Sequence, residues 1–187
     1  MRRRRPGDTL SVATDIEHIA LAEVRLLRRA RGGDGEARAD LLRPYEPGMW
    51  TLYSALYANA GEAHQAFSAL HAKLDTALKG FIDEAPFGLQ LYGLLWRELA
   101  GDLRPTDDEP QPIAHKGPLA KRTRAADRER VLAGLRRVDR YDALVWLFCV
   151  VTGLDLRRVA ELTGASLPAL AAARRRAAWS VHHALLT

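Results

Sequence analysis

Apolar residues recur at helical spacing along most of this 187-residue chain, and this spacing constrains its fold more than any other feature. Met49, Leu52, Tyr53, Leu56 and Tyr57 follow the i, i+3, i+4, i+7, i+8 pattern of a helix with one face in a core. β-Branched residues are sparse, and no long stretch alternates apolar with polar residues, so strands are not expected. The sequence therefore predicts an all-α fold.

Further helices are predicted wherever this spacing recurs between glycines, prolines or capping side chains. The first begins at a capping box formed by Thr14 and Glu17. The last three begin after the cap residues Asp139, Asp155 and Ser166. The expected helices cover, within a few residues, 14–30, 34–45, 49–59, 63–80, 91–103, 126–137, 140–152, 156–162 and 167–185.

The periodicity stops between residues 105 and 124, where four prolines and the acidic triplet Asp107-Asp108-Glu109 occur. Such a segment buries too little apolar surface to offset its ordering entropy, so we expect a flexible linker. The linker separates two small helical domains, residues 14–104 and residues 125–187. A basic, disordered tail is expected at residues 1–13, which include Arg2 to Arg5.

The net charge of +5 is distributed unevenly along the chain. Residues 6–114 carry ten Lys and Arg against seventeen Asp and Glu, whereas residues 115–187 carry fourteen against six. The basic C-terminal part is suited to neutralising phosphates, which the acidic part would repel. The alternative interpretation is that the two surfaces attract each other or only keep the protein soluble.

The longest apolar run, residues 143–151, is about half as long as a membrane-spanning helix requires. It contains the single cysteine, Cys149, for which the run predicts a buried, unpaired thiol. The N-terminal residues have no apolar segment of the kind that a secretion signal contains. We therefore expect a cytoplasmic protein without a membrane anchor.

No pattern typical of a catalytic or metal-binding site is found in the sequence. His64 and His71 would lie about 10 Å apart along a helix, too far for one zinc ion. Glu98 and Asp102 form an i, i+4 acidic pair, which is usually a solvated surface. Because nucleotide-binding loops and nucleophile elbows are also missing, we expect a protein that is not an enzyme and has no metal or cofactor.

The last two predicted helices are joined by Thr163-Gly164-Ala165, a short turn of the kind that a helix-turn-helix uses. In such a motif the second helix enters the major groove of DNA by its N-terminal residues. The periodicity from Leu170 to Ala177 places Arg174 near the buried side of that helix. A small helical bundle with solvated arginines and no DNA ligand is the alternative interpretation. The candidate DNA-binding residues are Arg157, Arg158, Ser166, Arg174, Arg175 and Arg176.

Two sets of residues together form a pattern known from one protein family. They are Gly33-Asp34-Gly35-Glu36-Ala37, Leu41, Leu42, Tyr45, Pro47, Pro86-Phe87, Leu91, Leu94 and Arg104, and then Leu135, Gly153-Leu154-Asp155, Val159-Ala160-Glu161-Leu162, Gly164, Leu170 and Arg176-Ala177. On these residues the chain resembles a divergent RNA polymerase sigma factor of the extracytoplasmic-function type. The resemblance implies a region 2-like bundle followed by a region 4-like helix-turn-helix domain. It also implies binding to core RNA polymerase and to the −10 and −35 elements of promoter DNA.

Three stretches depart from the family pattern. The acidic Asp-Leu-Val-Gln motif, which docks on the polymerase, is replaced by Gln65-Ala66-Phe67-Ser68. The Thr-Val-Lys-Ser-Arg stretch of the recognition helix is replaced by residues 169–173, mostly alanine, which removes donors to bases and phosphates. In the closing helix of region 2, the usual Trp and Asn are replaced by Gln90 and Arg97.

These observations lead to two hypotheses. The first is a divergent sigma factor-like transcription regulator that acts through core RNA polymerase and promoter DNA. In it, the resemblance assigns polymerase binding to Glu62, Gln65 and Ser68. The second is a sigma-like scaffold used as a protein-interaction module, for example a mimic that binds an anti-sigma factor or another regulator, with little or no DNA binding.

Overall fold

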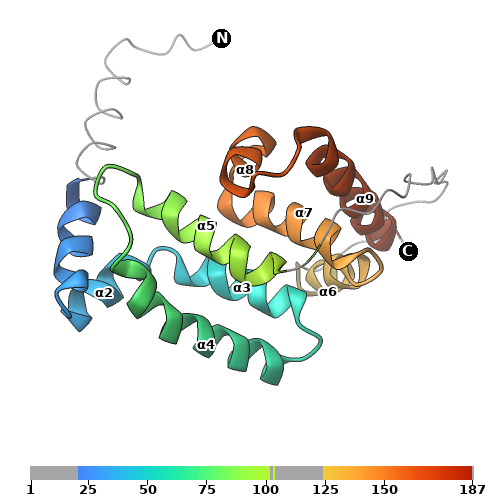
Figure 1. Ribbon diagram of the computed structural model, residues 1–187. Helices are drawn as coiled ribbons and strands as arrows, with labels where there is room; N and C mark the ends of the chain where they lie inside the picture. The colour runs from blue at the N-terminus through green and yellow to red at the C-terminus, as the bar shows by residue number, and fades with distance from the viewer. Residues whose placement is uncertain (1–20, 102, 104–123, 187) are drawn as a thin grey trace, which may run out of the picture.

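The computed structural model describes residues 21–101, 103 and 124–186 (Figure 1). Every regular element in these residues is an α-helix, as predicted. In the described part of the chain, none of these helices combines the length and the apolar character that crossing a membrane requires. The predicted tail, the Thr14–Glu17 capping box and all but the last residue of the predicted linker lie outside the described residues.

The first half of the chain forms a bundle in which short local signals set the helix ends. The Asp34 carboxylate accepts a hydrogen bond from the Ala37 backbone N–H at 3.0 Å, and another from Arg29. These bonds hold the pKa of Asp34 below its ordinary value. Asn59, expected to end a helix, instead begins one, since its side chain accepts from the Glu62 N–H at 2.9 Å. The elements are the helical residues 21–31, α2 (Gly35–Leu42), α3 (Glu46–Leu56), α4 (Ala60–Leu78) and α5 (Phe87–Ala100).

The second half forms four helices whose ends follow the predicted caps. Asp139, Asp155 and Ser166 each accept a hydrogen bond from a backbone N–H in the first turn of the helix that follows. Gly153 and Gly164 end their helices with φ of 70° and 71°, the left-handed conformation that glycine adopts without strain. The elements are α6 (Arg124–Leu135), α7 (Arg140–Thr152), α8 (Leu156–Thr163) and α9 (Leu167–Leu186).

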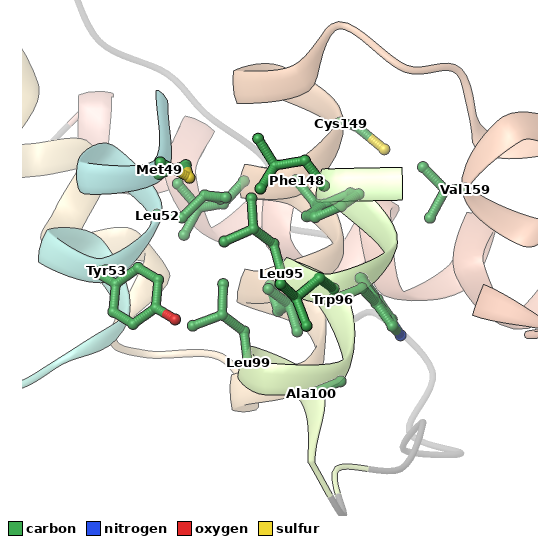
Figure 2. Packing of buried hydrophobic residues seen from close by; sticks show 14 of the residues in the cluster. Met49, Leu52, Tyr53, Leu95, Trp96, Leu99, Ala100, Phe148, Cys149 and Val159 are labelled. Atoms are coloured by element: carbon green, nitrogen blue, oxygen red, sulfur yellow. The ribbon is translucent and has the colours of Figure 1, made fainter. Parts of the chain in front are cut away.

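The helices of the two halves pack directly on each other and share one hydrophobic core. The Trp96 ring of α5 meets Phe148 of α7, with the ring centroids 5.3 Å apart. Figure 2 shows Leu95 and Trp96 on α5, close to Leu52 of α3 and to Phe148. α3 and α5 both contact α7, and α5 also contacts α8. The domain boundaries remain a prediction of the sequence, but the structure places both sets of helices in one body.

The two halves approach each other closely at two glycines. A Cβ atom added at Gly48 of α3 would lie 3.1 Å from Val151 Cγ1 of α7, and one at Gly93 of α5 would lie 3.4 Å from Leu162 Cδ1 of α8. The first distance is tighter than an ordinary van der Waals contact, and the second equals one. The seam between the halves is therefore closely packed at both places.

A buried ion pair ties α7 to α9. Arg176 Nε donates to Asp142 Oδ2 at 2.6 Å, and its NH2 group donates to Asp142 Oδ1 at 2.7 Å. Asp142 is 2% exposed and Arg176 is 9% exposed. This two-pronged geometry satisfies both charges away from water, which is the condition for burying them at all.

Removing the acid from this pair is expected to destabilise the fold strongly. Asp142→Ala leaves the Arg176 guanidinium buried without its carboxylate, so the free energy of unfolding falls by about 3–5 kcal/mol. Glu161→Ala removes the carboxylate that pairs with the exposed Arg158, and it costs at most about 1 kcal/mol. Urea unfolding of both variants checks this. Equal losses would contradict the assigned role of the buried pair.

Gly134 is expected to tolerate no side chain, because α6 meets α9 there. An added Cβ would lie 2.8 Å from Val181 Cα and 2.9 Å from the Ser180 carbonyl oxygen. Gly134→Ala should therefore destabilise by about 1–3 kcal/mol despite alanine's better helix propensity. Gly93→Ala, whose Cβ makes only an ordinary contact, should leave stability unchanged or raise it slightly. Thermal unfolding of the two variants is the measurement, and the opposite ranking would contradict the packing.

Candidate functional site

The turn between α8 and α9 positions the arginines of the C-terminal helices. α8 ends where the Gly164 N–H bonds to the Ala160 carbonyl oxygen at 2.8 Å, and Ser166 Oγ accepts from the Ala169 N–H at 3.3 Å. Val159 of α8 and Leu170 of α9 are fully buried, which fixes the two helices relative to each other. The predicted turn and its caps are therefore present in the structure.

Arg157, Arg158, Arg174 and Arg175 are all exposed on these two helices. Arg158 NH1 donates to Glu161 Oε2 at 2.8 Å on the same exposed surface. Within the described residues, no ion pair is found for the other three. The arrangement presents guanidinium groups on both sides of the turn, where they can donate to anionic oxygens. Ser166 is also exposed, although its hydroxyl already caps α9.

Two arginines differ from their predicted places. Arg176, predicted to contact DNA, is buried in the pair with Asp142, so it presents no guanidinium to a ligand. Arg174, expected near the buried side, is exposed. The physical reason is helical phase: Leu170, Ala173 and Ala177 face inward, which turns position 176 inward and position 174 outward.

The first turn of α9 faces α5 across a cleft. Ser166 and Ala169 line one side of a cavity of about 560 Å³, and Trp96 and Arg97 of α5 line the other. This is the end of the helix by which a helix-turn-helix enters the major groove. In this arrangement, α5 therefore borders the surface that would meet the bases.

The predicted polymerase-binding residues lie together on α4. Glu62, Gln65 and Ser68 are all exposed, at spacings of three residues along one side of the helix. Beside them Phe67 is half-buried against Trp50 of α3, with ring centroids 5.5 Å apart. The sequence did not identify Trp50 as a surface residue, because it lies next to Met49 in a stretch where apolar residues are expected in the core.

An aromatic cluster extends this surface along α4. The rings of Trp50 and His64 lie 5.0 Å apart, and those of Phe67 and His71 lie 4.7 Å apart, in edge-on geometry. Rigid aromatic side chains at a partly exposed position are typical anchors of protein–protein contacts. The surface therefore offers partly exposed aromatic rings for contact with another protein.

Gln90, where the sequence departs from the sigma-factor pattern that it resembles, holds the loop between α4 and α5. Its side-chain oxygen accepts from the Ile82 N–H at 2.7 Å, and its amide nitrogen donates to the carbonyl oxygens of Ile82 and Ala85. On the same loop, Asp83 accepts from Arg28 at 2.6 Å, and this bond lowers the pKa of Asp83. The loop is therefore fastened at two points. Arg97, the other replacement, is exposed beside the cleft near α9.

The described residues contain no group of three or more His, Cys, Asp or Glu placed to bind a metal ion. Glu98 accepts from Lys73 Nζ at 2.5 Å and is engaged in that ion pair, while Asp102 lies outside the described residues. Burial raises the pKa of the Cys149 thiol, an effect that the nearby Arg174 opposes. The thiol is therefore kept protonated and poorly nucleophilic at neutral pH.

Comparison with known proteins finds a similar solved structure but no similar sequence family. No protein-family model and no curated protein matches the chain. A solved structure of CnrH in complex with the cytosolic domain of CnrY matches with a TM-score of 0.62 and 18% sequence identity. The match covers 88% of this chain and 97% of that one. At this identity it shows the fold alone, and the fold of the chain is all-α and sigma-factor-like.

Proposed function

We propose that the protein is a divergent sigma factor-like transcription regulator that acts through core RNA polymerase and promoter DNA, without catalysis or a cofactor. The observation that carries this proposal is the set of exposed arginines on α8 and α9. Arg157, Arg158, Arg174 and Arg175 flank the Gly164 turn within a sigma-factor-like fold. Guanidinium groups in that position suit the phosphates of a DNA duplex.

The proposed DNA contact depends on phosphates more than on bases. The first turns of α9 carry alanine at 169 and 171–173, so they offer no donor or acceptor to base edges. The arginines at 174 and 175 come about two turns after the start of the helix, where side chains contact the DNA backbone. Binding should therefore be strongly salt-dependent and only weakly dependent on DNA sequence.

Polymerase binding is proposed for the exposed side of α4 that carries Glu62, Gln65 and Ser68. The neighbouring Trp50 and Phe67 support a protein contact there, because partly exposed aromatic rings bury apolar area at low entropic cost. This contact would be less acidic and more apolar than the one that the family resemblance implies.

The packing of the two halves limits how promoter DNA is bound. The −35 and −10 elements lie about 25 base pairs apart, or about 85 Å at 3.4 Å per base pair. A compact chain of 187 residues has a radius of gyration of only about 16 Å. Binding both elements at once therefore requires the contacts of α3 and α5 with α7, and of α5 with α8, to open.

A second candidate function is a protein-interaction module with little DNA binding. The CnrH structure that shares this fold contains the cytosolic domain of CnrY as a bound protein. The alanine-rich start of α9 and its position beside α5 also favour a protein-interaction module, since neither feature helps the helix to recognise DNA bases. In this case the regulatory partner would be a protein such as an anti-sigma factor.

Removing either arginine pair should weaken DNA binding and its salt dependence. Arg157→Gln/Arg158→Gln and Arg174→Gln/Arg175→Gln should each reduce the slope of log K against log salt by about 2, equally for unrelated duplexes. Fluorescence anisotropy with labelled duplexes across a salt series is the measurement. Arg25→Gln/Arg43→Gln removes two exposed charges from the first half and serves as the matched control. Equal losses in all three variants, or no retention of DNA at low salt, would contradict the proposal.

Core polymerase should co-purify with the tagged full chain and support run-off transcription. Gln65→Arg/Ser68→Arg should reduce polymerase capture at least about tenfold, because both positions lie inside the proposed contact. Thr76→Arg, exposed two turns further along α4, is the control and should leave capture unchanged. Capture of a stoichiometric regulatory protein, without polymerase and without initiation, would replace the first function with the second.

A further inference from the structure

A groove lies on the seam where the end of α3 meets the junction of α6 and α7. Its cavity measures about 350 Å³, within the range that bound ligands and anchoring side chains occupy in proteins. α7 begins at this junction and ends beside α8, so the junction and α8 lie at opposite ends of α7 (Figure 1). We call it the seam groove and define it by Leu56, Tyr57, Leu135, Arg136, Val138 and Arg140.

The floor of the seam groove is apolar. Leu135 is buried, and Leu56 and Val138 are half-buried against the core. Ala143 of α7 and Ala55 of α3 close the cavity from below with small side chains. Such a floor suits one apolar side chain of a ligand, which would lose contact with water on entering.

The rim of the groove is positively charged. The lining residues Arg136 and Arg140 are exposed, as is their sequence neighbour Arg137, and no ion pair is found for these three among the described residues. The Arg140 guanidinium lies 5.3 Å from the centre of the Tyr57 ring, which holds it at the groove edge. The acid within this stretch, Asp139, turns its carboxylate toward the Tyr141 N–H to cap α7.

An apolar floor under a basic rim fits a peptide better than a nucleic acid. A DNA duplex offers phosphates to arginines, but its bases are stacked and it has no apolar group that projects into a cavity. An acidic peptide offers carboxylates for charge-assisted hydrogen bonds, together with an apolar side chain for the floor. These arginines are also separate from those on α8 and α9 that are proposed to contact DNA.

We propose that the seam groove binds an acidic peptide segment with an apolar anchor residue. The anchor fills the cavity over Leu135, and the flanking carboxylates pair with Arg136 and Arg140. Because α3 forms one wall and the α6–α7 junction the other, the bound segment stabilises the packing of the two halves. This inference does not depend on the proposed DNA or polymerase contacts.

The test uses a labelled short peptide with glutamates on both sides of a central leucine, titrated with the full chain by fluorescence anisotropy. Saturable binding is expected. Arg136→Gln/Arg140→Gln should weaken it about tenfold or more, through loss of the charged contacts. Ala58 is exposed and lines the cavity, so Ala58→Trp should weaken peptide binding similarly, because the indole ring occupies the cavity and the charge is unchanged.

Two matched controls distinguish binding in the groove from non-specific attraction of an acidic peptide to a basic protein. Arg157→Gln/Arg158→Gln removes the same charge from α8 and should leave peptide affinity unchanged. A peptide in which serine replaces the leucine should bind about tenfold more weakly to the unaltered chain. Unchanged circular dichroism spectra and unfolding midpoints show that each variant is folded.

Three results would overturn the inference. One is the absence of saturable peptide binding. Another is equal weakening by the α8 variant and the groove variant, which would reveal only non-specific attraction to a basic protein. The third is binding of a DNA duplex that competes with the peptide and is weakened by Arg136→Gln/Arg140→Gln, which would assign the groove to nucleic acid.

Discussion

The packing of α3 and α5 on α7 is the interaction on which the rest of the structure depends. Leu95 of α5 and Phe148 of α7 are both fully buried (Figure 2), and the Trp96 ring of α5 contacts the Phe148 ring. This packing places α8 against α5, and it places the α6–α7 junction against the end of α3. The cleft beside α9 and the seam groove are therefore both consequences of it.

Features that depend on local chemistry were predictable from the sequence. Asp139, Asp155 and Ser166 begin their helices, and Gly153 and Gly164 end theirs, because a cap needs only its own side chain or φ angle. The packing of α3 on α7 was not predictable in this way. It depends on close approach at Gly48, whose sequence neighbourhood gives no sign of a distant partner.

Arg176 shows where a charge pattern misleads. Three consecutive arginines step around a helix by about 100° each, so they cannot all face solvent when positions 173 and 177 face the core. The sequence of α7 did contain a sign that one arginine is buried, because the acidic Asp142 directly precedes the apolar run of residues 143–151. A lone acid in such a run needs a cationic partner once it is buried.

The arginines of the C-terminal half therefore lie at several separate sites and do not form one DNA-binding face. Arg176 belongs to the buried ion pair, and four arginines are exposed on α8 and α9. Two others, Arg136 and Arg140, line the seam groove. If the chain binds both promoter DNA and a peptide in the seam groove, as proposed, the two binding events are coupled. A segment in the seam groove favours the packed halves, whereas binding both promoter elements requires them to separate. By linkage, each binding event then weakens the other by the same factor, whichever partner arrives first.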